Sequence, residues 1–85
     1  MGEDLTVVLF AQARIAVGRS RLRLPVDPRG RSLAELLQEL TDRHPRLGPV
    51  LLACRFVRNG EFVTARTTRF RPGDELGIHP PYSGG

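Results

Sequence analysis

The segment from residue 32 to residue 45 carries the pattern that most constrains this fold. Ser32 followed by Glu35 matches a capping box, in which the hydroxyl and the carboxylate each accept a backbone N–H at the start of a helix. Pro45 disfavours helical geometry at His44 and so ends that helix. Between these signals, leucines recur at the spacing of one helix face: Leu33, Leu36, Leu37 and Leu40. We therefore expect one main amphipathic helix, which needs a single apolar surface to cover.

Strand signals dominate the rest of the chain. Residues 5–10 are β-branched, aromatic and leucine side chains without breakers, which predicts a mostly buried first strand inside a sheet. Residues 21–24 alternate arginine with leucine, the pattern of a strand wet on one face, and form a plausible hairpin with the first. Asn59-Gly60 stands between two apolar pairs, a strong hairpin signal for strands over 53–58 and 62–63.

Three weaker elements complete the expected order. Residues 11–17 could form one or two helical turns before Gly18, residues 47–52 a short turn, and residues 75–79 a last strand. The order is strand, short helix, strand, helix, strand, strand, strand. Because one leucine face can cover only one sheet face, we expect an α+β roll in which a mixed sheet is packed by one main helix, as in a β-grasp arrangement.

Length and composition bound the domain organisation and the compartment. The 85 residues suit one domain, which we assign to residues 1–79, with residues 80–85 as a flexible C-terminal tail. Cys54 is the only cysteine, so no internal disulfide is expected and a reducing compartment fits. The sequence has neither a secretory signal pattern nor an apolar run of about 20 residues, which predicts a cytoplasmic protein without membrane contact.

The basic side chains are all arginine: 13 Arg and no Lys, against 9 acidic residues. They are scattered along the chain, with one group over residues 19–31 and a second over 66–71, and no aromatic side chains interleave with them as a base-stacking platform would need. A solvated face or an acidic partner is favoured over nucleic acid. The lack of Lys also means that the chain offers no ε-amine for an isopeptide bond.

Candidate catalytic and metal sites are scarce. His44 and His79 have no third residue at metal-ligand spacing, so we expect no metal. Cys54 lies in an apolar run, where burial would make it an inert structural thiol. The chain has neither phosphate-binding glycine motif, so we expect no bound cofactor or nucleotide.

The C-terminus is the one segment with a specific chemical pattern. A stiff Pro80-Pro81 pair is followed by Tyr82, Ser83 and two glycines, so the carboxylate could project up to roughly 20 Å from the sheet. Gly84 and Gly85 have no Cβ and could thread a channel that a side chain would block. An α-carboxyl group with a pKa of about 3.3–3.7 is ionised and a poor electrophile, so it needs activation, for instance by ATP.

Three anchors make this sequence resemble the MoaD and ThiS superfamily, which includes the sulfur-carrying small subunits of molybdopterin synthase. They are the opening strand and short helix over 7–14 with Gly18, the turn and last strand over 71–76, and the Pro-Pro-x-x-Gly-Gly ending over 80–85. The resemblance runs along nearly all 85 residues. It implies a ubiquitin-like β-grasp fold.

The resemblance also implies a role for the chain end. Gly85 would be adenylated by a ubiquitin-activating-type adenylyltransferase that consumes ATP, and a sulfur donor would then convert it to a thiocarboxylate. In the large subunit of the synthase, its sulfur would pass to a cyclic pterin precursor, and two donations would form the dithiolene. The chain would not be an enzyme on its own, because the acid and base residues belong to the large subunit, with which it would form a heterotetramer.

The same resemblance implies docking residues and leaves alternatives open. Phe10, Arg14 and His79 would contact partners, although His79 stands where an aromatic or hydrophobic residue is expected and Tyr82 replaces a smaller aliphatic one. The alternatives are a carrier of sulfur for thiazole or another product, a ubiquitin-like protein modifier, and an arginine-rich nucleic-acid binder.

Overall fold

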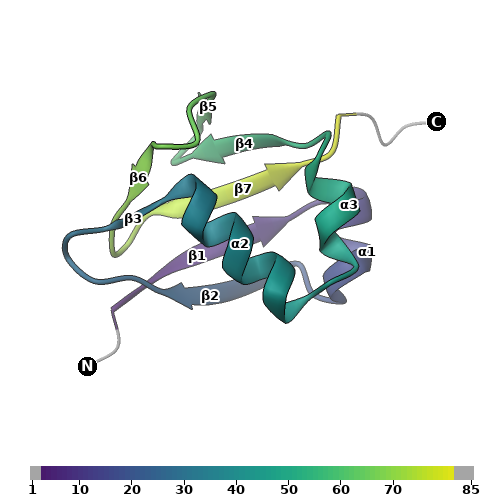
Figure 1. Ribbon diagram of the computed structural model, residues 1–85, viewed down its shortest axis with the longest axis horizontal. Helices are drawn as coiled ribbons and strands as arrows, with labels where there is room; N and C mark the ends of the chain where they lie inside the picture. The colour runs from purple at the N-terminus through teal and green to yellow at the C-terminus, as the bar shows by residue number, and fades with distance from the viewer. Residues whose placement is uncertain (1–2, 82–85) are drawn as a thin grey trace.

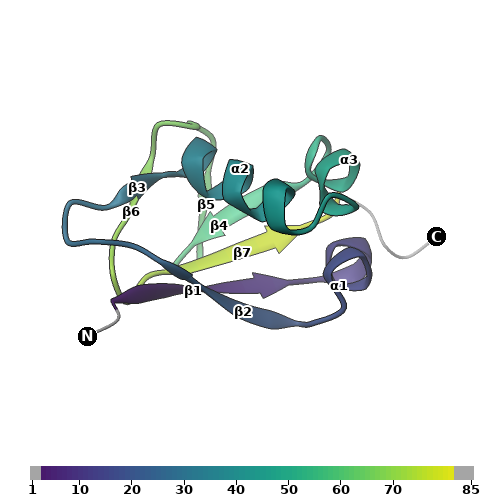
Figure 2. The same cartoon turned by 60° about the horizontal axis from the view of Figure 1, so that its bottom comes forward.

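A computed structural model describes residues 3–81 of the chain as two layers, a five-stranded sheet with helices on one face (Figures 1 and 2). The described chain has no helix long and apolar enough to cross a membrane. Its elements, in order, are β1 (Asp4–Leu9), α1 (Ala11–Val17), β2 (Arg21–Pro25), β3 (Arg31–Ser32), α2 (Leu33–Arg43), α3 (Leu47–Leu51), β4 (Arg55–Arg58), β5 (Glu61–Val63), β6 (Arg69–Phe70) and β7 (Glu75–His79).

The sheet is mixed, in the order β2-β1-β7-β4-β5. The first and last strands, β1 and β7, lie side by side and run parallel, with Leu9 opposite Ile78. The pairs β1–β2, β4–β7 and β4–β5 are antiparallel. This arrangement confirms the expected α+β roll, the hairpin of the first two strands and the mixed sheet.

Helix α2 forms as its sequence pattern predicts. The Ser32 hydroxyl accepts the Glu35 N–H at 3.1 Å and the Glu35 carboxylate accepts the Ser32 N–H at 2.9 Å. The Ser32 backbone N–H stabilises the ionised form and lowers the pKa of Glu35 from its ordinary value of 4.5, against a smaller opposing effect of desolvation. All four leucines of the stripe are buried against the sheet, and the helix ends at Arg43, with His44 as its C-cap.

The hairpin over Asn59-Gly60 is also confirmed. Both residues have positive φ, 50° and 90°, as a two-residue hairpin turn of the I′ kind requires. Val57 faces Phe62 across the turn. The Asn59 side chain also joins this hairpin to β7, because its amide nitrogen donates to Asp74 Oδ1 at 3.0 Å and its oxygen accepts the Glu75 N–H at 2.8 Å.

A second, two-stranded sheet was not predicted. Its strands β3 and β6 pair Arg31 with Phe70 and bury the Phe70 side chain completely. Gly30 precedes β3 with φ +85°, and a Cβ at that position would lie 2.7 Å from the Phe70 carbonyl oxygen. Strands of two residues have no period to read, and their pairing joins segments almost forty residues apart, so local pattern could not reveal them.

Two sequence-based expectations need correction. The strand expected over 53–58 begins only at Arg55, because the N–H groups of Ala53 and Cys54 donate back to Val50 and Leu51 and prolong the helical turn of α3. The first strand is buried on one face only. Leu5, Val7 and Leu9 are buried whereas the residues between them are half-buried, since the helices cover one side of the sheet.

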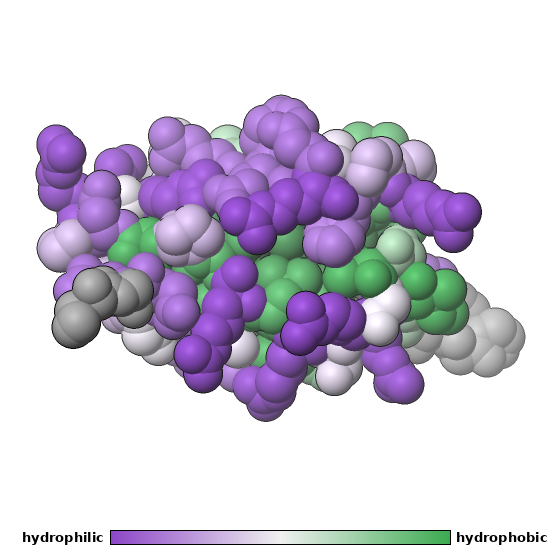
Figure 3. Space-filling view, turned by 90° about the horizontal axis from the view of Figure 1, so that it is seen from below, coloured by the Kyte–Doolittle hydropathy of each residue, from purple (hydrophilic) through white to green (hydrophobic). Residues whose placement is uncertain are grey.

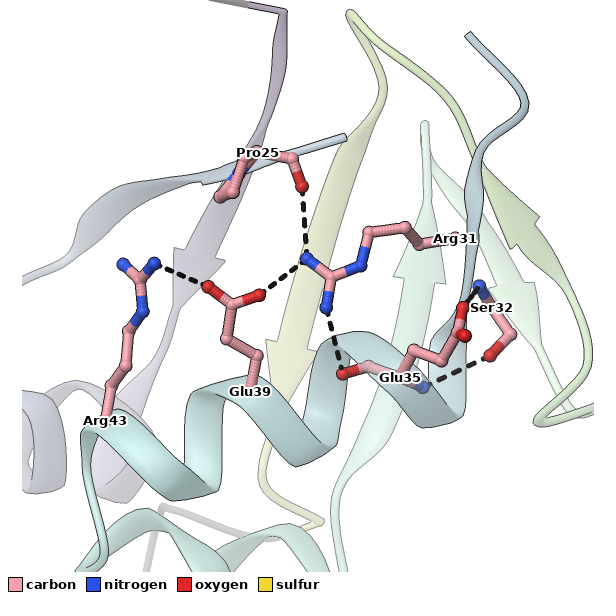
Figure 4. A network of polar contacts seen from close by, with 6 residues as sticks. All are labelled: Pro25, Arg31, Ser32, Glu35, Glu39 and Arg43. Carbon is pink, nitrogen blue, oxygen red and sulfur yellow. Dashed lines mark hydrogen bonds and ion pairs between the residues drawn. The ribbon is translucent and has the colours of Figure 1, made fainter. Parts of the chain in front are cut away.

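An ion-pair network fixes α2 to the strands beside its first turns (Figure 4). The Glu39 carboxylate accepts a hydrogen bond from Arg31 at 2.6 Å and forms an ion pair with Arg43 at 2.5 Å. Arg31 also donates to the Pro25 carbonyl at 3.1 Å. One carboxylate thus joins the middle of α2 to the end of β2 and to β3.

Candidate functional site

The described chain ends at the middle of the sheet. β7 lies between β1 and β4, and its last residue, His79, is still paired with Arg55. The Phe10 N–H donates to the Ile78 carbonyl at 3.3 Å on the other side. Because parallel strands end at the same edge, the start of α1 and the exit of the chain at Pro80 lie together at one end of the molecule (Figure 1).

Phe10 and His79 form a stacked pair at this exit. Their ring centroids are 4.2 Å apart and the ring planes are inclined by 22°. Both side chains are on the sheet face opposite the helices, since Leu9 and Ile78 next to them point into the core. Gly77 makes room for the histidine, because a Cβ there would lie 3.1 Å from the His79 Nε2.

Arg14 follows that pair in the first turn of α1, where its N–H donates to the Phe10 carbonyl at 3.3 Å. The chain turns from β1 into α1 at Ala11, whose φ of 48° is unusual for a residue with a Cβ. Arg14 follows one helical turn later, is exposed, and its carbonyl accepts the N–H of Gly18, which caps α1 in the left-handed conformation at φ 88°. The structure therefore brings Phe10 and His79 into contact and leaves Arg14 on the solvent side of α1.

Further apolar side chains extend this face across the sheet. Val57 on β4 lies opposite Gly77 of β7 and opposite Phe62 of β5, so all three belong to the face that carries His79. Phe62 is 68% exposed and Phe10 is 42% exposed. We call Phe10, Val57, Phe62 and His79 the outer-face patch, which is a surface suited to a protein partner.

Sequence reasoning missed Phe62 as a docking candidate. Its position beside the Asn59-Gly60 turn indicates a strand but not, by itself, a docking role. The alternation that places Phe56 in the core and Val57 outside would have predicted that Phe62, directly opposite Val57, also points outside. The Arg55 guanidinium lies 5.9 Å from the Phe62 ring centroid and borders the patch.

The tail itself is only partly described. Pro80 is half-buried beside His79 and Pro81 is exposed. The candidate residues Tyr82, Ser83, Gly84 and Gly85 lie outside the described residues. Within residues 3–81 no group of three His, Cys, Asp or Glu side chains is placed to hold a metal ion.

Cys54 has the surroundings of a structural thiol. Its Sγ donates to the Val50 carbonyl at 3.2 Å, and burial raises the pKa of the thiol. It borders a surface hollow of about 450 Å³, next to Phe56, over whose ring the Arg66 guanidinium lies at 5.6 Å. Nothing around Cys54 in the described chain favours the thiolate that a nucleophile needs, in agreement with the sequence-based interpretation.

Comparison with known proteins points to one family. The sequence model of the ThiS family matches residues 7–85. A curated relative, the molybdopterin synthase sulfur carrier subunit of Chlamydomonas reinhardtii, is 32% identical over 83 residues, which are 96% of this chain and 99% of the relative.

Solved structures show the same fold. SAMP1 from Haloferax volcanii, a small archaeal modifier protein, has a TM-score of 0.81 and 30% identity, with 96% of this chain and 99% of that chain covered. A complex of subunits 1 and 2 of the molybdopterin-converting factor from Helicobacter pylori contains a chain with a TM-score of 0.70 and 18% identity, covering 96% of this chain and 99% of that one. The expected ubiquitin-like β-grasp fold is thereby confirmed.

Proposed function

The chain belongs to the ThiS family, within the MoaD and ThiS superfamily, and from that premise we propose that it is the sulfur carrier subunit of a molybdopterin synthase. The reacting group is the carboxyl group of Gly85, and residues 80–85 deliver it into the active sites of partner proteins. The main support is the similarity to a sulfur carrier subunit, which covers nearly the full length of this chain and of that relative.

The observation of the structure that carries this proposal is the exit of the chain from a central strand. β7 is held by β1 on one side and by β4 on the other up to Ile78 and His79. The direction in which the chain leaves at Pro80 is therefore set by the rigid sheet and not by a loop. A partner that docks on the outer-face patch would receive the tail in one orientation.

The chemistry follows from the poor reactivity of a carboxylate. In the activating partner the Gly85 carboxylate attacks the α-phosphorus of ATP and releases pyrophosphate, which forms an acyl adenylate. A sulfur donor then supplies sulfide, which attacks the acyl carbon and displaces AMP, so that the end becomes a thiocarboxylate. This chain binds no cofactor of its own in that scheme, because ATP is bound and consumed by the partner.

The second stage takes place in the large subunit. The thiocarboxylate sulfur forms a bond to a carbon of the cyclic pterin precursor and displaces an oxygen substituent from that carbon. Hydrolysis of the acyl–sulfur bond then leaves the sulfur on the pterin and restores the Gly85 carboxylate. Two such donations complete a dithiolene. The partners are thus the large subunit, in a heterotetramer, an adenylyltransferase of the ubiquitin-activating type and a sulfur donor, all in the cytoplasm. The acid and base residues belong to the large subunit, so the chain is not an enzyme on its own.

The tail residues each have a place in this proposal. Gly84 and Gly85 thread the narrow part of a partner's channel, where a Cβ would collide. Pro80 and Pro81 keep the base of the tail extended, and Tyr82 and Ser83 span the distance between the sheet and that channel. Phe10, Arg14 and His79 dock on the partner, together with Phe62.

The test uses the thiocarboxylate of the whole chain, a large synthase subunit and the sulfur-free pterin precursor, with dithiolene formation as the readout. Product from the thiocarboxylate, and none from the plain carboxylate, is the expected result. Gly85→Ala should fold normally but fail to become thiocarboxylated. No product with a verified thiocarboxylate and a large subunit that works with its own carrier would refute the pathway.

The similarity to SAMP1 supports a second candidate function, that of a ubiquitin-like protein modifier. In a protein modifier the same activated end would be attacked by a lysine amine of a target and form an isopeptide bond. The two functions separate by mass spectrometry of cell extracts, because only a modifier leaves Gly85 linked to target lysines. A carrier for thiazole synthesis would instead keep the thiocarboxylate but react with a different acceptor.

A further inference from the structure

β2 leaves one side of its backbone unused by the sheet. It is the outermost strand beside β1. The Leu9 N–H donates to the Ser20 carbonyl at 2.9 Å and the Val26 N–H donates to the Glu3 carbonyl at 3.2 Å. In an antiparallel ladder these contacts alternate, so the backbone groups of residues 20, 22, 24 and 26 face β1. The N–H and C=O groups of Arg21 and Arg23 therefore point away from the sheet.

The side chains beside this edge are mostly arginine, and Leu22 lies between them. The Arg21 and Arg23 side chains are 66% and 75% exposed, and their carboxylate partners, Glu75 and Asp4, lie at 3.9 Å, the limit of an ion pair. Seen from the β2 side, hydrophilic side chains surround a band of hydrophobic surface (Figure 3). A hollow of about 670 Å³ at this place, which we call the β2 hollow, is lined by Thr6, Arg19, Arg21, Leu22, Arg23, Arg43 and His44.

We propose that the β2 edge binds an extended acidic segment of a partner protein, which joins the sheet as a further strand. Residues directly opposite one another in a ladder share a face, so carboxylates opposite Arg21 and Arg23 would meet the two guanidinium groups. The residue between them would lie over Leu22, in the β2 hollow. Main-chain bonds supply affinity and the alternating side chains supply specificity, as in other cases of strand addition.

The length of the added segment is limited by Pro25. Proline has no N–H, and its carbonyl already accepts a hydrogen bond from Arg31 at 3.1 Å. The backbone groups that remain free to pair with an added strand are those of Arg21 and Arg23. Because the hydrogen-bonded positions of an antiparallel pair recur every two residues, a partner segment of about five residues is long enough to pair with both.

Charge decides between the candidate occupants. A second copy of this chain, paired edge to edge, would place arginine rows against arginine rows, and like charges directly opposite destabilise a pair of strands. A nucleic acid would satisfy the guanidinium groups but has no peptide backbone to match the N–H and C=O groups of Arg21 and Arg23. The observations favour an acidic peptide.

The experiment uses the full chain, labelled for NMR, and a peptide in which three glutamates alternate with two valines. The matched control peptide has the same composition with the three glutamates adjacent. We expect the alternating peptide to slow hydrogen exchange at the Arg21 and Arg23 amides at least about fivefold, and the control peptide to leave them unchanged, because only the alternating one fits the ladder. Equal slowing by both peptides, or none by either, overturns the proposal.

Charge reversal tests the side chains. The double variant Arg21→Glu with Arg23→Glu should weaken binding of the alternating peptide at least about tenfold, since opposite charges across the interface become like charges. Arg29→Glu with Arg71→Glu makes the same change of charge on exposed turn residues away from the β2 hollow and should leave binding unaltered. Circular dichroism of both variants checks that they fold.

Two further outcomes would contradict the inference. Binding of single-stranded RNA that matches or exceeds the peptide would show that the hollow is a phosphate site. Equal weakening by both double variants would show that only net charge matters. The tail plays no part in these measurements, so they are independent of the proposed carrier function.

Discussion

Gly30→Ala is the substitution whose cost the structure defines most sharply. Gly30 has φ +85°, is buried, and approaches the Phe70 backbone so closely that a Cβ would lie 2.7 Å from its carbonyl oxygen. The carbonyl is part of the β3–β6 ladder and cannot rotate away without breaking it. Gly18 provides the matched control, since it has φ +88° but no atom within 4 Å of a built Cβ.

Both substitutions place an alanine in the left-handed conformation, but only Gly30→Ala also creates a steric overlap. A left-handed conformation costs an alanine about 1–2 kcal/mol at either position. Overlap in a packed region adds about 1–3 kcal/mol at Gly30 alone. We therefore expect Gly30→Ala to lower the free energy of unfolding by about 2–5 kcal/mol and Gly18→Ala by about 1–2 kcal/mol.

Urea denaturation of both variants, followed by circular dichroism, measures the difference. For a domain of this size each kcal/mol also lowers Tm by roughly 4–8 °C. A destabilisation by Gly30→Ala that does not exceed that of Gly18→Ala would refute the close approach of Gly30 to Phe70. If Gly30→Ala does not fold at all, Gly30→Ser cannot replace it, because serine has the same Cβ and the same clash. Phe70→Leu is then the second variant, and it should lower the free energy of unfolding of the same small sheet without a clash at residue 30.

Three more predictions concern charge, pH and docking. Glu39→Gln should destabilise by about 1–3 kcal/mol in urea, because it leaves Arg31, only 25% exposed, without its carboxylate; no change would mean that the pair is merely solvated. The lowered pKa of Glu35 implies stability that is complete above pH 4.5 and is lost as pH falls through the lower folded value, so acid titration of Glu35→Gln should lack that component. Phe10→Ala should weaken binding to a large synthase subunit in calorimetry at least about tenfold, while Gln38→Ala on α2 should not; equal affinities would exclude the outer-face patch.

Local sequence signals predicted the helices and turns that are stabilised by interactions between residues close together in the chain. The capping box of Ser32 and Glu35 and the leucine stripe define α2 within a dozen positions, and Asn59-Gly60 defines the β4–β5 hairpin because both residues accept positive φ. Gly18 and Pro45 ended their helices as expected. The Pro-Pro and Gly-Gly pattern and the opening strand were enough to indicate the family, which the comparisons then confirmed.

Contacts between distant segments were decided by the tertiary structure. The Phe10–His79 stack, the β3–β6 ladder and the exposure of Phe62 on the face of His79 all depend on which strands become neighbours. Strand order is a property of the whole sheet, since each pairing is stable only when the others form around a shared core. The sequence by itself determined a β-grasp chain with a Gly-Gly end. The placement of β7 between β1 and β4 decided where the chain leaves the sheet at Pro80, because a strand's position in a sheet is set by long-range packing and not by its own residues.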